Sequence, residues 1–266
     1  MADRQAGRVG WLELNAQRSA LGVGFYRDLF GWGIRAVPIA PWGVLPFFEH
    51  GGRPIGLAFC AMGAFAPPRW LLEFLGDPDD AHDRVARLGG EAGGLSHVPG
   101  HGRVASLRDP DGCLFKVLAP ERADASGQPP EVWFPDRALP GGIWGAGLWA
   151  WRAERLVEFY TALFGLEAEV LTTDRHAACG AVTALTAGGE IRLLIHDTEY
   201  EIARARWVPM ICSVSPGGDG RRAEVLGAVP QVPVFAVEGV GRVGVWSDPA
   251  GADVAMIDPQ PASAPT

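Results

Sequence analysis

Residues 25–32 read Phe-Tyr-Arg-Asp-Leu-Phe-Gly-Trp, and residues 159–166 read Phe-Tyr-Thr-Ala-Leu-Phe-Gly-Leu. Two further pairs follow in the same order and at nearly the same spacing. Pro-Arg-Trp-Leu at 68–71 is matched by Ala-Arg-Trp-Val at 205–208, and Asp-Pro-Asp-Gly at 109–112 by Asp-Pro-Ala-Gly at 248–251. Three ordered matches indicate an internal duplication. The sequence therefore predicts two copies of one domain, which can be compared position by position.

The bulk composition agrees with two ordinary globular domains. The chain has 266 residues, of which 48% are hydrophobic and 20% are charged. We assign the first copy to residues 7–120 and the second to 143–260. Residues 121–142 contain four prolines among polar residues and lack hydrophobic periodicity, so they are interpreted as a linker.

Charge and the N-terminal sequence exclude several classes of protein. The net charge is −8 and no basic stripe is present, so we expect no nucleic acid and no membrane surface as partner. The first eight residues have no apolar segment of the kind that signal peptides carry. No apolar run approaches the ~20 residues that span a bilayer. These features predict a cytoplasmic protein.

Each copy shows the same order of elements twice. Alternation at 11–15 predicts a strand, and apolar residues on one face predict a helix from Ser19, its expected N-cap, to Gly31. Three strands follow at 34–37, 44–48 and 55–60. The order restarts with a strand at 70–74, a helix opened by Asp77 and Pro78, and strands at 93–97, 103–107 and 113–118. In the second copy, helices are expected at 154–164 and 220–226.

These motifs resemble the vicinal oxygen chelate superfamily, which includes glyoxalase I, extradiol dioxygenases and bleomycin-resistance proteins. The resemblance rests on the Phe-Tyr-x-x-Leu-Phe-Gly helix end, the glycine hairpin at 51–55, the Arg-Trp strand start and the Asp-Pro-x-Gly turn. It covers nearly the whole chain, in tandem form. It implies an α+β protein in which four βαβββ modules form two glyoxalase-like open-barrel domains.

Metal-dependent members of that superfamily place ligands on the first, fourth, fifth and eighth strands of a domain. In the first copy, these positions fall on Glu13, on strand 55–60 without a ligand, near Trp70 and on Lys116. In the second copy, they fall on Gly147, His196, Trp207 and Ala255. One candidate ligand in each copy does not make a metal site, and lysine is a cation that donates hydrogen bonds only. We therefore expect no metal and no other cofactor.

The same positions suggest a different kind of site. Glu13 and Lys116 are expected to face each other across the first cavity, as candidate catalytic groups or as a structural ion pair that replaces the metal. Trp11 and Asn15 share strand parity with Glu13, so both are candidate ligand-binding residues, with Trp70 beside them. In the second copy, the candidates are Trp149, His196 and Trp207.

Two functions of different classes remain open. The first is a metal-free small-molecule binder with cavities walled by Trp for an aromatic or polyketide-like ligand. The second is an enzyme on the same scaffold, a lyase, isomerase, cyclase or oxygenase, with Glu13 as acid or base and Lys116 or Asn15 as the polarising group. A metal-dependent glyoxalase or dioxygenase requires a different strand register. Because the second copy lacks comparable polar groups, the first copy is expected to hold the working cavity.

Overall fold

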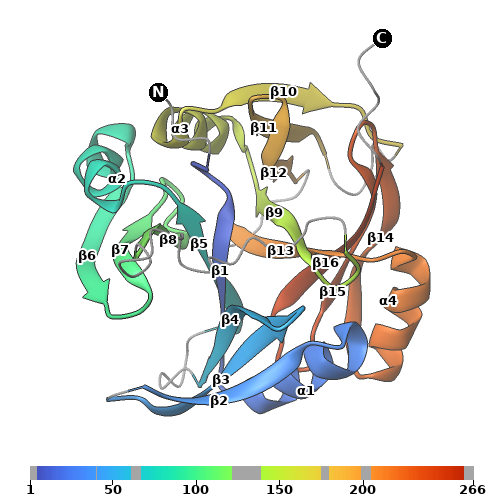
Figure 1. The fold of residues 1–266 in the computed structure, drawn as a ribbon. Helices are drawn as coiled ribbons and strands as arrows, with labels where there is room; N and C mark the ends of the chain where they lie inside the picture. The colour runs from blue at the N-terminus through green and yellow to red at the C-terminus, as the bar shows by residue number, and fades with distance from the viewer. Residues whose placement is uncertain are drawn as a thin grey trace.

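The computed structural model describes six stretches of the chain, residues 5–39, 41–60, 67–121, 139–174, 180–198 and 205–260. Most of the predicted linker, residues 122–138, lies outside them. The described residues form two eight-stranded sheets, one from each copy. Figure 1 shows the two sheets meeting at the centre of the molecule, with helices toward the outside.

The elements of the first copy are β1 (Val9–Ala16), α1 (Ser19–Phe30), β2 (Gly33–Ile39), β3 (Gly43–His50), β4 (Arg53–Cys60), β5 (Arg69–Leu75), α2 (Pro78–Val85), β6 (Glu91–Val98), β7 (Gly102–Arg108) and β8 (Leu114–Pro120). Those of the second are β9 (Ile143–Ala150), α3 (Glu154–Phe164), β10 (Glu167–Leu171), β11 (Val182–Ala187), β12 (Glu190–Asp197), β13 (Arg206–Cys212), α4 (Pro216–Val225), β14 (Val229–Val237), β15 (Gly241–Ser247) and β16 (Asp253–Pro259).

The two sheets have the same topology. The strand order is β2-β3-β4-β1-β5-β8-β7-β6 in the first and β10-β11-β12-β9-β13-β16-β15-β14 in the second. Within each module the first strand pairs in parallel with the last, as β1 does with β4 and β5 with β8. The first strands of the two modules, β1 and β5, pair antiparallel and join the modules. This order confirms the predicted α+β fold of four βαβββ modules in two copies.

Local sequence explains most helix ends. The Asp77 carboxylate accepts hydrogen bonds from the backbone N–H groups of Asp79 and Asp80, and Pro78 occupies the first helical position of α2. Gly31 and Gly165 end α1 and α3 in the left-handed conformation, where a side chain is unfavourable. Ser19 was predicted to cap α1, but it is the first helical residue and Arg18 precedes it without a side-chain cap.

The fourth helix begins earlier than the sequence predicted. It starts at Pro216 rather than at Gly220, because the hydroxyl of Ser215 accepts a hydrogen bond from the backbone N–H of Gly218. Two adjacent glycines, Gly217 and Gly218, weaken the local helix propensity. The Ser-Pro start is a normal N-terminal signal that these glycines obscured.

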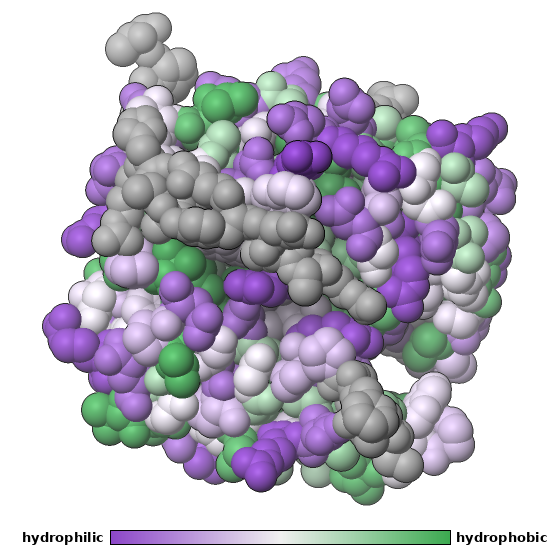
Figure 2. All heavy atoms as spheres, turned by 180° about the vertical axis from the view of Figure 1, so that it is seen from behind, coloured by the Kyte–Doolittle hydropathy of each residue, from purple (hydrophilic) through white to green (hydrophobic). Residues whose placement is uncertain are grey.

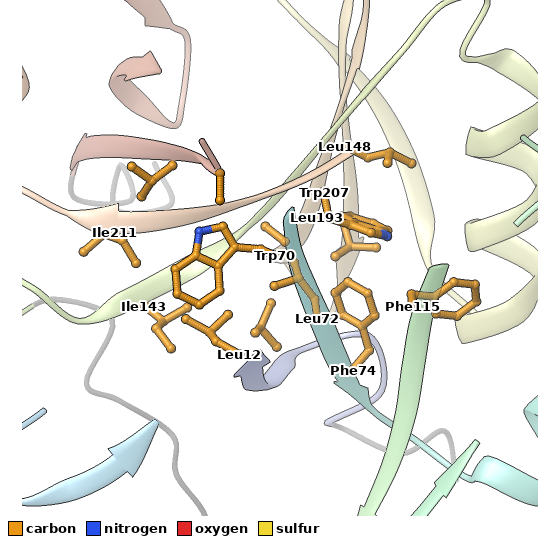
Figure 3. Packing of buried hydrophobic residues seen from close by; sticks show 14 of the residues in the cluster. Leu12, Trp70, Leu72, Phe74, Phe115, Ile143, Leu148, Leu193, Trp207 and Ile211 are labelled. Carbon is orange, nitrogen blue, oxygen red and sulfur yellow. The ribbon is translucent and has the colours of Figure 1, made fainter. Parts of the chain in front are cut away.

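The two copies share one hydrophobic core. A single buried cluster includes Leu12, Trp70 and Phe74 from the first copy, and Leu148 and Trp207 from the second. The rings of Phe74 and Trp207 lie 4.8 Å apart between centroids, and Figure 3 shows these side chains meeting between β5 and β13. Because each large side chain contributes roughly 1.5–3 kcal/mol on burial, this shared core binds the copies together.

The duplicated motifs also join the copies. The Tyr160 hydroxyl, on α3 of the second copy, donates to Asp109 Oδ2 in the Asp-Pro-Asp-Gly turn of the first copy at 2.9 Å. Tyr26 on α1 lies close to Asp248 in the equivalent turn of the second copy. Its hydroxyl accepts a hydrogen bond from the Trp70 indole N–H at 3.2 Å. The tyrosine of one repeat motif thus meets the aspartate of the other, across the copies.

Among the described residues, no helix is both long and apolar enough to cross a bilayer. On the face shown in Figure 2, hydrophobic residues are scattered among polar ones. The most exposed large hydrophobic side chains, such as Val225, Val214, Val170 and Val44, come from separate elements.

Candidate functional site

The candidate site lies on one face of the first sheet. Alternate residues of β1 point to opposite faces. Leu12 and Leu14 enter the shared core, whereas Trp11 packs in a separate cluster with Val104 and Leu118. We call the Trp11 side the inner face. Glu13 lies on the inner face by strand parity. The first sheet is curled into a half-barrel (Figure 1).

Four polar side chains converge on this inner face. Lys116 Nζ donates hydrogen bonds to Glu13 Oε1 and, at 3.2 Å, to Glu73 Oε1. His101 Nε2 lies 2.7 Å from Glu73 Oε2 and donates to it. Strand pairing accounts for the arrangement, because Glu73 on β5 is the register partner of Lys116 on β8. The predicted Glu13–Lys116 pair is therefore present, as part of a larger group that we call the polar cluster.

Access to the polar cluster differs between its members. The side chains of Glu13 and Lys116 are 16% and 20% exposed, and that of Glu73 is 2% exposed. Glu73 is thus enclosed, with its two carboxylate oxygens facing Lys116 and His101. Glu13, Lys116 and His101, whose side chain is 15% exposed, are the members that a molecule entering the half-barrel can touch.

Neighbouring groups give the two buried carboxyl groups different pKa values. Burial raises the pKa of Glu13 from 4.5 to about 7; the charge of Lys116 opposes this rise, and the Glu73 carboxylate adds to it. Burial also acts to raise the pKa of Glu73, but the hydrogen bond from His101 and the charge of Lys116 outweigh it and lower the value to about 2. Burial acts to lower the pKa of Lys116, and the charges of Glu73 and Glu13 raise it overall. Lys116 and Glu73 are therefore charged at neutral pH, while Glu13 titrates there.

Sequence reasoning missed Glu73 and His101. Strand 70–75 is apolar at every position except Glu73, and all but its first residues are almost fully buried. Hydrophobicity therefore does not show which residues of this strand face the inside of the half-barrel, and Trp70 was predicted to do so. A lone carboxylate in an apolar strand was the available signal, since it needs a partner. His101 lies in the turn between β6 and β7, where no periodicity assigns a face.

The two tryptophans predicted to wall the cavities lie elsewhere. Trp70 pairs opposite Leu14 and Trp207 opposite Leu148, and all four belong to the shared core. Both tryptophans therefore point away from the inner faces, as Figure 3 shows for the core side. The placement of Trp70 and Trp207 as cavity walls was wrong. The inner face of the first sheet is instead lined by Trp11, with Phe47 and Leu57 packed beside it.

Asn15 lies at the end of β1 beyond Glu13. Its side-chain amide donates to the backbone carbonyl of Glu13 at 3.3 Å. It shares the parity of Glu13 and is half-buried. The structure therefore brings Trp11, Glu13, Asn15 and Lys116 to one face, as predicted.

The inner face of the second sheet is filled by apolar side chains. Trp149 and His196, two predicted ligand-binding residues, stack on each other with ring centroids 4.1 Å apart and an interplanar angle of 3°. Burial lowers the pKa of His196 to about 3, so the imidazole is neutral. Around them lies a cluster of Val, Leu, Met and Phe side chains.

Each member of the polar cluster has an apolar counterpart in the second copy. Met210 pairs with Ala255 as Glu73 pairs with Lys116. Gly147 pairs with Val208 as Glu13 pairs with Leu71. Val240 corresponds to His101, because each accepts a backbone hydrogen bond from the residue that follows the last strand of its copy. The counterparts of the cluster are therefore Gly147, Met210, Val240 and Ala255.

A separate cavity of about 520 Å³ lies at one end of the second sheet. Its lining includes Pro140, Trp144, Glu190, Val240 and Asp258. It includes no residue of the polar cluster, so it provides a second location at which binding can be tested.

The donor set of the polar cluster does not fit a divalent metal ion. The Lys116 ammonium occupies the position between the Glu13 and Glu73 carboxylates where a cation would be held. An ammonium group has no lone pair and cannot act as a ligand. Across the described residues, no group of three or more His, Cys, Asp or Glu side chains has the geometry to hold a metal ion.

Comparison with known proteins gives the fold. No family model matches the chain, and no curated protein matches it. The Mn(II)-bound glyoxalase from Novosphingobium aromaticivorans is 14% identical, with a TM-score of 0.62 over 97% of this chain and 86% of that one. The 2,3-dioxygenase LapB from Pseudomonas sp. KL28 is 12% identical, with a TM-score of 0.64 over 98% of this chain and 96% of that one. A mutant 4-hydroxymandelate synthase from Streptomyces coelicolor is 14% identical, with a TM-score of 0.63 over 98% and 94%. The chain therefore has the fold of these glyoxalase and dioxygenase structures, the vicinal oxygen chelate fold that its repeated motifs predicted.

Proposed function

We propose that the chain is a metal-independent small-molecule-binding protein whose working site is the inner face of the first half-barrel. The observation that carries this proposal is the restriction of the polar cluster to one copy. Glu13, Glu73, His101 and Lys116 meet there, while the counterparts in the second copy are apolar. Since both copies have the same topology, the fold does not require these charges.

The energetics support a use for the cluster. Withdrawing charged groups from water is costly, and replacing a buried ion pair by apolar residues is often neutral or stabilising. The second copy contains such an apolar arrangement around Ala255 and Met210. The first copy retains a charged group, and Glu13 and Lys116 in it remain reachable from solvent. Binding of a ligand there would account for both features.

The surroundings of the cluster define the ligand class. Phe47 and Leu57 are half-buried beside Trp11 and supply apolar contact on the same face. A mostly apolar lining with a few placed polar groups suits an aromatic or polyketide-like molecule. The ligand's polar group would meet Glu13 and Lys116, and its apolar part would lie against Phe47 and Leu57.

The test is a screen of aromatic and polyketide compounds by Trp fluorescence in the presence of chelator. The strongest compound is then titrated into the wild type, Glu13→Ala and Trp144→Ala. We expect Glu13→Ala to weaken binding about tenfold, because it removes the hydrogen-bonding carboxyl group from a largely desolvated site. Trp144→Ala, in the cavity of the second sheet, should bind as the wild type does. The opposite pattern places the working site in the second copy and refutes the proposal.

A second candidate, catalysis of acid–base chemistry, is favoured by Glu13 itself. A carboxyl group whose pKa is raised to about 7 and that is 16% exposed exchanges protons readily at neutral pH. With Lys116 as a neighbouring electrostatic stabiliser, it would serve a lyase, isomerase or cyclase. Mass spectrometry of the screened compound after incubation distinguishes the candidates: turnover that Glu13→Gln abolishes indicates the enzyme, and unchanged compound indicates the binder.

A further inference from the structure

Glu73 and His101 pair with each other in the polar cluster, and their position requires an explanation. Glu73 is 2% exposed and its two oxygens face His101 and Lys116. His101 lies in the β6–β7 turn, with its ring 5.2 Å from that of Trp11. Its side chain is 15% exposed, but its Nε2 is already engaged by Glu73.

The geometry treats the two carboxyl groups unequally. Glu73 has a cationic donor on one oxygen and an imidazole donor on the other, which stabilise its anion. Glu13 has the ammonium group, which it shares with Glu73, and a side-chain hydrogen bond with Glu73 itself, which favours the protonated form of Glu13. Two carboxyl groups around one ammonium cannot both be ionised without repulsion. The proton therefore goes to the carboxyl with fewer donors.

We propose, building on the binding function above, that Glu73 and His101 are positioning residues that keep the exchangeable proton of the cluster on Glu13. The reachable part of the cluster then offers the Lys116 ammonium as a donor, beside a Glu13 carboxyl group that is neutral and not an anion. The ligand's polar group is consequently an acceptor oxygen, such as a carbonyl, and not an amine.

The other neighbours of Glu13 do not change this balance. Its register partners are Leu57 on β4 and Leu71 on β5, both uncharged. The groups that set its pKa are burial, Lys116 on β8 and Glu73 on β5, whose anion is held by His101. The pKa values of about 7 for Glu13 and about 2 for Glu73 agree with the unequal geometry.

The experiment is carboxyl carbon NMR of the full chain labelled with ¹³C at the Glu side chains. Glu13→Gln and Glu73→Gln assign the two signals. In the wild type, Glu13 should titrate near 7 and Glu73 should stay ionised to about 2. In His101→Leu, which removes the donor to Glu73, the midpoint of Glu73 should rise and that of Glu13 should fall. His97→Leu, at an exposed histidine on the same hairpin, is the matched control and should behave as the wild type.

The proposal is overturned if Glu73 is the carboxyl that titrates near neutrality, or if His101→Leu leaves the midpoint of Glu13 unchanged. Should His101→Leu not fold, Glu73→Gln gives the same decision. Removing the Glu73 anion leaves all of the attraction of Lys116 to Glu13, whose midpoint should fall from about 7 toward 4.5.

Two probes with the same ring test the ligand class separately. Acetophenone carries a carbonyl acceptor, and benzylamine is a cation at about pH 6. Acetophenone should bind the wild type, as measured by Trp fluorescence, and weaken as pH rises through the midpoint of Glu13; benzylamine should not bind. Binding of benzylamine in preference to acetophenone refutes the acceptor class. If neither probe binds, the binding function loses its support, while the carboxyl titration still decides where the proton lies.

Discussion

At the scale of single residues, Glu13 is the group whose ionisation changes near neutral pH. Its pKa is raised from 4.5 to about 7 in the folded state, so folding takes up a proton between these values. The folded state holds this proton more tightly than the unfolded state does, so the full contribution to stability is present below the unfolded-state pKa of 4.5 and is lost as pH rises through 7. Stability therefore falls as pH rises from 4.5 toward 7, by up to about 3 kcal/mol for this group.

Glu13→Gln should remove this fall. Glutamine keeps the shape and cannot ionise, so the variant should gain free energy of unfolding relative to the wild type as pH increases through 7. Urea unfolding at several pH values from about 4.5 to 8 measures the difference. A difference that is the same at every pH would mean that Glu13 is ionised throughout.

Lys116→Met should act in the opposite way. It leaves Glu73, and above pH 7 also Glu13, buried without the ammonium that contacts both. Breaking a buried ion pair by removing one partner costs roughly 3–5 kcal/mol, and these side chains are 20% exposed or less, so a loss of about 2–4 kcal/mol is expected. The loss should be larger at pH 8 than at pH 5; equal losses at both would show that Lys116 acts through packing alone.

At the scale of elements, helix α4 contains two glycines with opposite requirements. A Cβ on Gly220 would lie 2.1 Å from Trp246 Cζ2, whereas one on Gly217 would meet nothing within 4 Å. Gly217→Ala should stabilise the protein by about 0.5–1 kcal/mol through helix propensity. Gly220→Ala should destabilise it by roughly 1–3 kcal/mol because Trp246 must move. Thermal melts of both variants decide the matter, and equal effects would contradict this packing of α4.

The sequence predicted the elements better than their faces. Helix α1, the helix start at Asp77 and the four-module order follow from periodicity and caps. The face of β5 did not, because a strand buried on both sides shows no alternation. That ambiguity moved Trp70 to the wrong side and hid Glu73. Glu13 and Lys116 were predictable because they occupy the first-strand and eighth-strand positions at which the resembling superfamily places metal ligands.

At the scale of the whole molecule, the two copies are joined through one core. The shared core contains residues of both sheets, and Tyr160 of one copy donates to Asp109 of the other. The sequence predicted the duplication but not this joining, since contacts between copies leave no periodic signal. We therefore expect a single unfolding transition by calorimetry, with equal calorimetric and van't Hoff enthalpies. Two resolved transitions would show that the copies fold independently.

The tyrosine–aspartate contact gives a second test at this scale. Tyr160→Phe removes the hydroxyl from a buried Asp109, whose pKa burial raises to about 6. Loss of a donor to a buried carboxyl should cost about 1–3 kcal/mol and should lower stability without splitting the transition. Chemical denaturation measures this cost; an unchanged free energy of unfolding would mean that the hydrogen bond contributes nothing between the copies.

We propose that the Lys116 ammonium takes the place of a metal ion between the Glu13 and Glu73 carboxyl groups, so that binding in the first half-barrel requires no metal. The most direct measurement is elemental analysis of the purified chain, combined with titration of the strongest screened compound with and without added Mn(II), Fe(II) or Zn(II). We expect no stoichiometric metal, and the same ligand affinity without added metal and with each of the three metals. A metal bound at one per chain, lost in Glu13→Ala together with ligand affinity, would contradict it.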